Sequence, residues 1–309
     1  MAVPAYPPGN RRTLPRLRAI FDDCRPAACI ALNEARERCI GEFGASAAAL
    51  AWIDPATALP DDGNPPEPCA VSPSTPAVLQ YTSGSTSAPK GVIVSHRNVS
   101  RLFEAATQAG HFAFDEHDVW SLFHSHAFDF AVWELWGAWL YGGRAVLVPE
   151  AVCRQPDAFL DLLANQRISV LNQTPSAFYA LQSQAARREV ELSVRAIVFG
   201  GEALEPSRLQ PWHARYPQTE LINMYGITET TVHVSFHRLS EQDLHSPVSR
   251  IGRALPDLSV HVLDEAGQPV PLGVVGELVV EGDGVAELVQ PVGAQVEHVQ
   301  RLVAQVLTL

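Results

Sequence analysis

Short apolar runs alternate with stretches that have one polar face along most of this 309-residue chain. Residues 1–53 begin with apolar residues at helical spacing and continue with continuous apolar runs at 27–32 and 48–53. Such a mixture predicts an N-terminal α/β segment. Residues 54–76 are rich in proline and show no periodicity, which predicts a surface connection.

From residue 77 onward, strand-like runs and helical stretches follow one another with little interruption. The expected strands lie at 77–79, 92–94, 119–123, 145–148, 169–171, 196–199 and 221–222. Ser95 is expected to cap a helix that Gly110 closes, and an apolar helix is expected over 128–141. The alternation predicts an α/β core at 77–250, with mostly parallel sheets covered by helices.

After residue 250 the pattern changes to strands joined by turns, as in G-E-L-V-V-E-G. This predicts a partial, β-rich subdomain at 251–286. The tail, 287–309, is expected to form an amphipathic helix, because its valines recur at helical spacing. These valines are Val296, Val299, Val303 and Val306.

Composition narrows the classes of partner. The formal net charge is -12 and the isoelectric point is near 5.3, so the surface should repel nucleic acids and anionic membranes. Small molecules or proteins are the expected partners. The cysteine count is five, without a C-x-x-C spacing, which favours reduced thiols over a disulfide framework or a zinc site. With no leader or membrane segment visible, we expect a cytoplasmic protein.

The sequence Y-T-S-G-S-T-S-A-P-K-G, between two expected strands, carries the clearest chemical signal. Hydroxyls, a permissive glycine and a lysine suit an anion with many oxygens, such as a polyphosphate. The residues expected to contact it are Thr82, Ser83, Gly84, Ser85, Thr86 and Lys90. A Gly-Lys-Ser/Thr P-loop is excluded, because Lys90 leads into a strand rather than a helix. A Ser-rich linker is the alternative, and the flanking strands disfavour it.

This stretch resembles the phosphate loop T-S-G-S-T-x-x-P-K-G of the adenylate-forming (ANL) enzymes, departing from it at Ser87, where the family usually has Gly. The resemblance implies the large-subdomain fold of that superfamily, with ATP and Mg²⁺ as cofactors. It also implies an adenylate-forming ligase in which Lys90 contributes to catalysis.

The sequence N-M-Y-G-I-T-E resembles the family motif N-x-Y-G-x-T-E. Its chemistry is coherent, because Tyr225 can stack on adenine, Thr228 can donate to the α-phosphate and Glu229 can hold magnesium. Thr228 and Glu229 are therefore expected to be catalytic. The nucleotide-binding set is completed by Asn223, Gly226, Gly200, Gly201 and Glu202, of which the last three follow the strand at 196–199. A polar loop with a solvated glutamate is the alternative.

Two histidines in H-S-H-A-F-D suggest a metal site, but no third ligand follows, and we reject that interpretation. The segment F-D-F-A-V-W-E resembles the version in nonribosomal peptide synthetases, in which Asp129 would pair with the ammonium of an amino acid. A helix cap is the structural alternative for Asp129. The resemblance implies a substrate pocket similar to threonine-selecting pockets. Its residues are Asp129, Phe130, Trp133, Asn172, Val198, Gly200, Met224, Val232 and His233.

The resemblance covers roughly residues 2–286. The printed sequence contains neither the T-G-D whose aspartate binds ribose in the family nor a lid domain with its lysine. The expected function is thus an incomplete adenylation core that activates an amino acid and passes it to a carrier protein or synthetase module, which alone would bear phosphopantetheine. A fatty-acyl-AMP ligase, suggested by the start A-V-P-A-Y-P-P, and a catalytically silent nucleotide-binding fragment remain alternatives.

Overall fold

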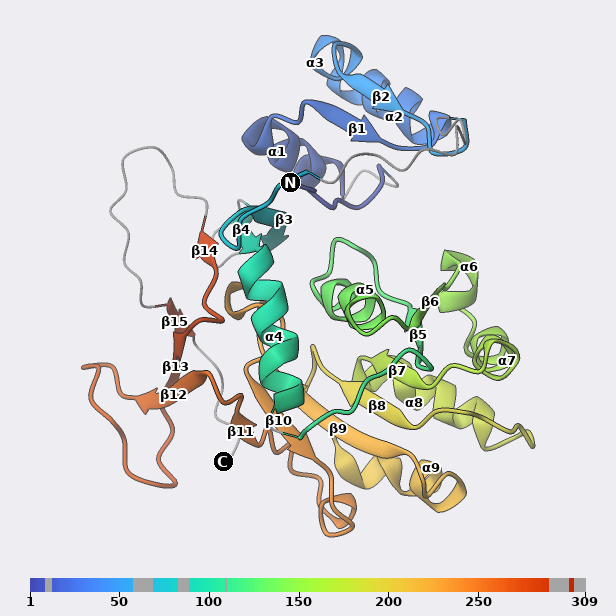
Figure 1. Ribbon diagram of the computed structural model, residues 1–309, viewed down its shortest axis with the longest axis vertical. Coiled ribbons are helices and arrows are strands. Elements are labelled where there is room, and N and C mark those ends of the chain that lie inside the picture. Colours follow the sequence, from blue (N-terminus) through green and yellow to red (C-terminus); the bar gives the residue numbers. More distant parts are fainter. Residues whose placement is uncertain (9–12, 58–68, 83–88, 109, 289–299, 303–309) are drawn as a thin grey trace.

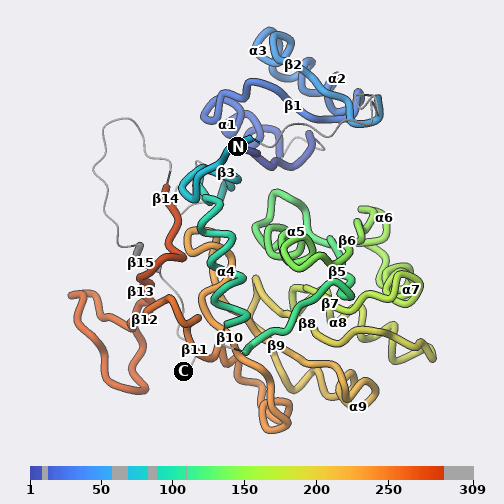
Figure 2. Tube along the Cα trace, in the orientation of Figure 1, coloured from blue at the N-terminus to red at the C-terminus, as the bar shows by residue number. Residues whose placement is uncertain are grey.

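The computed structural model describes residues 1–8, 13–57, 69–82, 89–108, 110–288 and 300–302. Figures 1 and 2 show the N-terminal segment at one end, a large sheet with its helices at the other, and the C-terminal strands along one side. The N-terminal elements are α1 (Leu14–Cys24), β1 (Ala28–Ile30), α2 (Asn33–Phe43), α3 (Ala45–Ala48) and β2 (Ala51–Ile53). Strands β1 and β2, which lie at the two apolar runs, pair with each other in parallel.

Strands do flank the expected phosphate loop. Strand β3 (Pro76–Thr82) pairs antiparallel with β4 (Lys90–Ser95), and β14 (Glu287–Leu288) adds to β4. This sheet is separate from the large one, a distinction that the prediction of mostly parallel sheets in a core at 77–250 did not make. The apolar runs predicted the strands, but they carried no information about the sheet that each strand joins.

Helix α4 (His96–Gln108) begins where Ser95 was expected to cap it, since the Asn98 amide donates to Ser95 Oγ at 3.1 Å. The apolar side of this helix, which includes Val99, Leu102 and Phe103, is buried in the core. Gly110 has a φ of +69°, the left-handed conformation that favours glycine after a helix.

A seven-stranded sheet forms the centre of the molecule, in the order β11-β10-β9-β8-β7-β5-β6. Its strands are β5 (Val119–Leu122), β6 (Arg144–Leu147), β7 (Val170–Gln173), β8 (Ala196–Phe199), β9 (Glu220–Tyr225), β10 (Ser235–Arg238) and β11 (Arg253–Ala254). The strands from β6 to β9 run parallel, and β10 and β11 are antiparallel additions at one edge. The predicted α/β class with a mostly parallel, helix-covered sheet is confirmed.

Helices cover both faces of this sheet, which is why its central strands are continuously apolar. In β8, Ala196 and Val198 pack with α4 and α5, whereas Ile197 and Phe199 pack with α7, α8 and α9. The helices are α5 (Phe130–Leu140), α6 (Glu150–Cys153), α7 (Pro156–Gln166), α8 (Pro175–Ala185) and α9 (Gln210–Arg215), with short 3-10 turns at η1 (Pro206–Leu209), η2 (Thr228–Thr230) and η3 (Asp243–His245). Figure 1 shows the same layering.

The β-rich part at the C-terminal end is formed by β12 (Leu258–Leu263) and β13 (Glu277–Gly282), with β15 (Gln300–Leu302) beside β13. The helix expected over 287–309 is wrong for 287–288 and 300–302, which are strands that complete two sheets. Backbone pairing with β4 and β13 overrides the weak helical periodicity there. The remaining tail residues lie outside the described residues.

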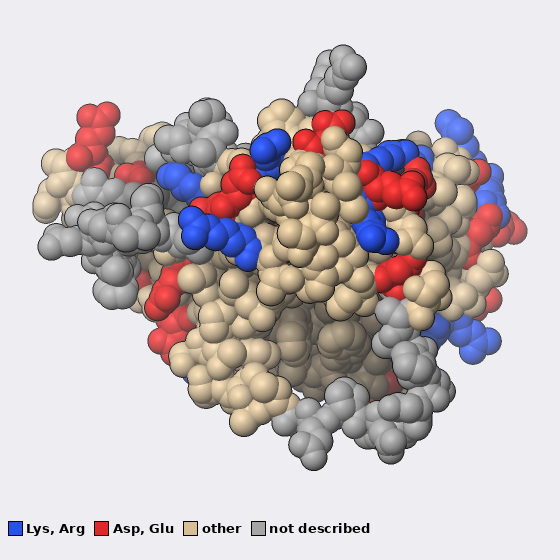
Figure 3. All heavy atoms as spheres, turned by 90° about the horizontal axis from the view of Figure 1, so that it is seen from above, with Lys and Arg blue, Asp and Glu red and all other residues tan. Residues whose placement is uncertain are grey.

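The described surface agrees with the acidic, mixed composition. On the face shown in Figure 3, Lys and Arg side chains lie beside Asp and Glu side chains. Within the described ranges, every helix is too short or too polar to cross a lipid bilayer.

Candidate nucleotide and substrate site

A pocket of about 290 Å³ lies where the carboxyl ends of β8 and β9 meet the start of α5 and the end of β3. Ligands of parallel α/β sheets gather beyond this edge. The pocket is lined by Thr82, Phe128, Asp129, Phe130, Gly201, Met224, Gly226, Ile227, Thr228, Glu229, Val232 and His233. Residues from the expected phosphate loop, from N-M-Y-G-I-T-E and from the expected substrate set therefore share one cavity.

Asp129 lies at the buried floor of the pocket, directly before α5. It occupies the N-cap position, yet its carboxylate makes no capping hydrogen bond. Instead, Thr228 Oγ1 donates to Asp129 Oδ2 at 2.7 Å. Burial raises the pKa of Asp129 to about 6, the Thr228 hydroxyl acts in the opposite direction, and the charge of Glu229 adds to the rise. A carboxylate held in this setting gains from a cationic partner.

Glu229 connects the pocket to the phosphate-loop strand. Thr82 Oγ1, at the end of β3, donates to Glu229 Oε1 at 3.3 Å across 147 residues of chain. Within the described part of the chain there is no cluster of three or more His, Cys, Asp or Glu side chains able to hold a metal alone. One carboxylate beside a polyphosphate fits Mg²⁺, which binds proteins through one or two carboxylates and takes its other ligands from phosphates and water.

Phe130 and His233 form part of the inner wall of the pocket, and buried aromatic and polar side chains lie behind them. Trp133 Nε1 donates to Asn172 Oδ1 at 3.0 Å, and the ring of His233 meets the rings of Phe130 and Trp133 edge-on, at 5.3 and 5.0 Å between centroids. Asn172 Nδ2 and both ring nitrogens of His233 have no hydrogen-bond partner among the described residues. Complete burial lowers the pKa of His233 to about 3, so its imidazole is neutral, with one donor and one acceptor available.

Tight backbone contacts shape the loop that carries Thr228 and Glu229. A Cβ at Gly226 would lie 2.2 Å from the carbonyl oxygen of Val232, so only glycine fits there. Thr231 and Val232 have φ values of +59° and +67°, a strained conformation for β-branched residues. Motif reasoning did not identify this strain, because the residue types themselves favour extended backbone.

His124 and Glu134 form a buried pair behind the pocket, which explains the histidine that invited a metal interpretation. His124 Nδ1 lies 2.9 Å from Glu134 Oε1, and the amides of Phe123 and His124 donate to Glu134 Oε2 at 3.1 Å each. The imidazole stacks on Phe130 with centroids 4.8 Å apart. Glu134 thus supports the segment that carries Asp129. A glutamate inside a very apolar helix was the available signal for it.

Several expected residues lie outside the pocket. Trp133, Asn172 and Val198 are fully buried behind its wall. Glu202 accepts hydrogen bonds from the amide and hydroxyl of Ser176, at the start of α8. Asn223 Nδ2 donates to the carbonyl oxygen of Arg250 at 2.7 Å. These two polar side chains are engaged in local structure rather than directed into the cavity.

The other described residues expected to contact the nucleotide do not line this first pocket. Tyr225 is half-buried and lines a second pocket, of about 200 Å³, beside β12 and β13. Gly200 lies beside the first cavity, where a Cβ would contact the Phe130 ring at 3.4 Å. Lys90 is exposed at the first position of β4. Ser83, Gly84, Ser85 and Thr86 lie outside the described residues.

Relatives of the chain are found among peptide synthetases. Dimodular nonribosomal peptide synthase of Bacillus subtilis (strain 168) is 53% identical over 234 residues, which are 72% of this chain and 10% of that protein. Syringomycin synthase SyrB1 of Pseudomonas syringae pv. syringae is 49% identical over 214 residues, covering 68% of this chain and 34% of SyrB1. The chain thus spans about a tenth and about a third of the length of these relatives.

Solved structures agree on the fold. The structure of McyG A-PCP complexed with phenylalanyl-adenylate matches with a TM-score of 0.79 at 20% identity, over 92% of this chain and 47% of that one. Holo-PA1221, an NRPS protein containing adenylation and PCP domains, matches with a TM-score of 0.63 at 27% identity, over 78% of this chain and 41% of that one. The model of the family described as "AMP-binding enzyme" matches residues 1–288. The chain therefore belongs to the AMP-binding enzyme family, as its phosphate-loop and N-x-Y-G-x-T-E motifs predicted.

Proposed function

We propose that this chain is the core of an amino-acid adenylation domain of a nonribosomal peptide synthetase, which binds ATP with Mg²⁺ and activates the amino acid as an aminoacyl adenylate. One observation carries the proposal: Thr228 hydrogen-bonds to Asp129, and the next residue, Glu229, contacts Thr82 at the start of the phosphate loop. The residues proposed to hold the ammonium and the phosphates are thus adjacent. That adjacency suits a reaction between an amino acid and ATP.

In this reaction the carboxylate oxygen of the amino acid attacks the α-phosphorus, the bond to the β,γ-diphosphate breaks, and pyrophosphate leaves with the electron pair. Asp129 would hold the substrate ammonium, which places the carboxylate toward Thr228. The Thr228 hydroxyl would donate to an α-phosphate oxygen. Glu229 would hold Mg²⁺, which supplies charge neutralisation on the phosphates. Most of the catalysis then comes from positioning and electrostatic stabilisation.

We propose threonine as the amino acid. A substrate hydroxyl would find a partner in the neutral imidazole of His233, which lines the pocket and whose ring nitrogens have no partner among the described residues. Phe130, Trp133 and Met224 are each at most 1% exposed and fill the space around them. Little more than a methyl group fits beside the hydroxyl, and a fatty-acyl tail would leave Asp129 without a cationic partner. A carrier domain of the same or another cytoplasmic synthetase would accept the product.

Binding of a non-hydrolysable threonyl-adenylate analogue, measured by calorimetry, tests the proposal. We expect Asp129→Asn to weaken binding by about 2 kcal/mol or more, since a buried ammonium would lose its charged partner. Asp118→Asn is the matched control, because Asp118 is similarly buried but pairs with Arg195 at a distance from the pocket. Undiminished affinity in folded Asp129→Asn protein would contradict the proposal.

A further inference from the structure

We propose that Arg101 and Asn98 of helix α4 are positioning residues for Glu229. Both side chains contact the turn at 283–286 and fix its position. The turn is hydrogen-bonded to the loop that carries Glu229. The inference rests on the proposed function, because it concerns the residue that would hold Mg²⁺ there. Neither side chain belongs to the pocket or to the motifs that identify it.

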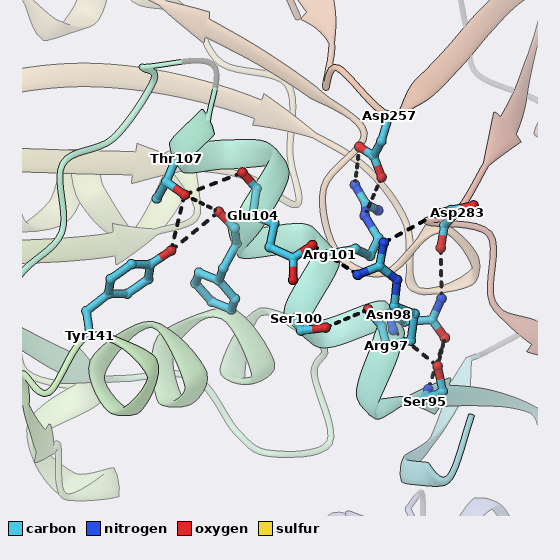
Figure 4. Close-up of polar contacts among 11 residues, drawn as sticks. Ser95, Arg97, Asn98, Ser100, Arg101, Glu104, Thr107, Tyr141, Asp257 and Asp283 are labelled. Atoms are coloured by element: carbon cyan, nitrogen blue, oxygen red, sulfur yellow. Dashed lines mark hydrogen bonds and ion pairs between the residues drawn. The ribbon is translucent and has the colours of Figure 1, made fainter. Parts of the chain in front are cut away.

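Arg101 is anchored as a buried cation. Its side chain is 2% exposed, its Nε lies 2.7 Å from Asp257 Oδ2, and its Nη2 donates to Asp257 Oδ1 at 2.9 Å (Figure 4). Burial lowers the pKa of Arg101, and Asp257 opposes this effect. Nη1 has no hydrogen-bond partner among the described residues and faces Gly284, where an added Cβ would lie 2.0 Å away. The guanidinium therefore occupies the place of a side chain at residue 284.

Asn98 holds the same turn from one helical turn earlier. Its Oδ1 accepts from the amide and the hydroxyl of Ser95, at 3.0 and 2.7 Å, which fixes the orientation of the side chain. Its Nδ2 then donates to the carbonyl oxygen of Asp283 at 3.1 Å. Figure 4 shows both residues directed from α4 toward the turn. Asn98 and Arg101 thus contact successive residues of one short segment.

The turn is tied directly to the loop of Glu229. The Ala286 amide donates to the carbonyl oxygen of Glu229 at 2.8 Å, and Thr231 Oγ1 donates to the carbonyl oxygen of Gly284 at 2.8 Å. Glu229 lies within the 3-10 turn η2 and Thr231 directly follows it, so these two bonds hold the loop at the turn and just after it. A displaced turn would therefore displace the Glu229 backbone, and a shift of about 1 Å at a positioned group can cost about a hundredfold in rate.

The test compares the gain in ATP affinity that Mg²⁺ produces, measured by calorimetry with Mg²⁺ and with EDTA. We expect this gain to fall about tenfold in Arg101→Met and in Asn98→Ala, and to recover in part in Arg101→Lys, which restores the charge. Arg195→Met is the matched control, since it breaks the Arg195–Asp118 pair away from the turn, and its gain should stay within about twofold of wild type. Hydrogen exchange at the Ala286 amide should accelerate in the first two variants and not in the control.

An unchanged Mg²⁺ gain in folded Arg101→Met and Asn98→Ala proteins would overturn the inference. So would an equal loss in Arg195→Met, because it would trace the effect to general destabilisation. If the wild-type chain gains nothing from Mg²⁺, the proposed function fails and the role of Arg101 in positioning a metal ligand fails with it. Hydrogen exchange separates the cases, since slow exchange at Ala286 in both variants contradicts the positioning contact independently of any ligand.

Discussion

The hydroxyl of Thr228 donates to the carboxylate of Asp129 at 2.7 Å, so a residue expected to contact phosphate is hydrogen-bonded to a residue expected to contact the amino acid. These positions lie 99 residues apart in the chain. The bond gives Asp129 a polar partner in the free protein. An entering ammonium would add charge compensation that a hydroxyl cannot supply.

Binding of a threonyl-adenylate analogue should weaken as the pH falls through about 6. The pKa of Asp129 is raised to about 6 by burial, so its carboxyl becomes neutral there, while an α-ammonium with a pKa near 7.7–8.0 stays charged. Below this point we expect affinity to fall by up to about tenfold per pH unit. Calorimetry between about pH 5 and 7 measures it, with Asp129→Asn as the control whose weaker binding should be flat. A flat profile in the wild type would contradict the ammonium assignment.

Thermal stability should depend on the ionisation of both Asp129 and His233. The pKa of Asp129 is raised on folding, so its contribution to stability is present below its ordinary value of 3.8 and is lost as the pH rises through about 6. The pKa of His233 is depressed from 6.5 to about 3, so its contribution is present above 6.5 and is lost as the pH falls. Because the two trends oppose each other, melting curves of Asp129→Asn and His233→Leu should change with pH in opposite senses relative to wild type.

The pocket should select a hydroxyl over a methyl group of the same size. We expect the threonyl analogue to bind at least about tenfold more tightly than the valyl analogue, because valine would place a methyl group against the unpartnered ring nitrogens of His233. His233→Leu should reduce this ratio. Competition binding with both analogues measures it, and equal affinities in the wild type would exclude threonine selectivity.

Nucleotide affinity should depend on the Tyr225 ring. If the ring stacks on adenine, Tyr225→Ala weakens ATP binding by about 1–3 kcal/mol and Tyr225→Phe leaves it nearly unchanged. Because Tyr225 also lines the pocket beside β12 and β13, melting temperatures must be compared to separate stacking from packing. Unchanged ATP affinity in a folded Tyr225→Ala protein would refute the stacking assignment.

A polypeptide limited to residues 1–309 should bind these ligands but adenylate slowly. It contains no T-G-D and no lysine after Ala286, and losing one transition-state contact costs about a hundredfold or more in rate. Threonine-dependent ATP–pyrophosphate exchange, with and without a separately expressed lid domain, measures this. Rescue by the lid is the expected result, whereas full exchange by the chain alone would show that those contacts are dispensable.

The elements of this fold were largely predictable because its strands are buried on both faces and read as apolar runs. Their arrangement was less so. The runs at 77–79 and 92–94 pair with each other as β3 and β4. Strand β14 then pairs with β4, where Glu287 lies opposite Ile93, a residue almost 200 positions earlier in the chain. The motifs that carry Asp129 and Thr228 follow β5 and β9 of the central sheet, whereas the phosphate loop follows β3 of the separate sheet, and residues from all three stretches line the pocket.

Polar residues with local partners were the least predictable part of the site. Glu202 and Asn223 each bond to a neighbouring element, and the sequence did not indicate these partners, because no sequence signal distinguishes a ligand contact from a helix cap or a loop anchor. Their role as nucleotide contacts stays a prediction. Glu134 was the reverse case. Its charge interrupts an apolar helix, which indicates a buried partner, yet only the structure identifies His124 as that partner.

The left-handed backbone at Thr231 and Val232 has a consequence for how substrate preference can change. Val232 lines the pocket, so exchanging it alters the ligand that fits, and the same exchange relieves or increases backbone strain. Glycine or asparagine there would relieve the backbone strain and widen the cavity, but it would lose the buried apolar contacts of Val232, whereas isoleucine would keep the strain and narrow the cavity. A change at position 232 that admits a larger substrate therefore exchanges buried side-chain contacts for relief of backbone strain, so its net effect on stability is smaller than that of an ordinary core truncation.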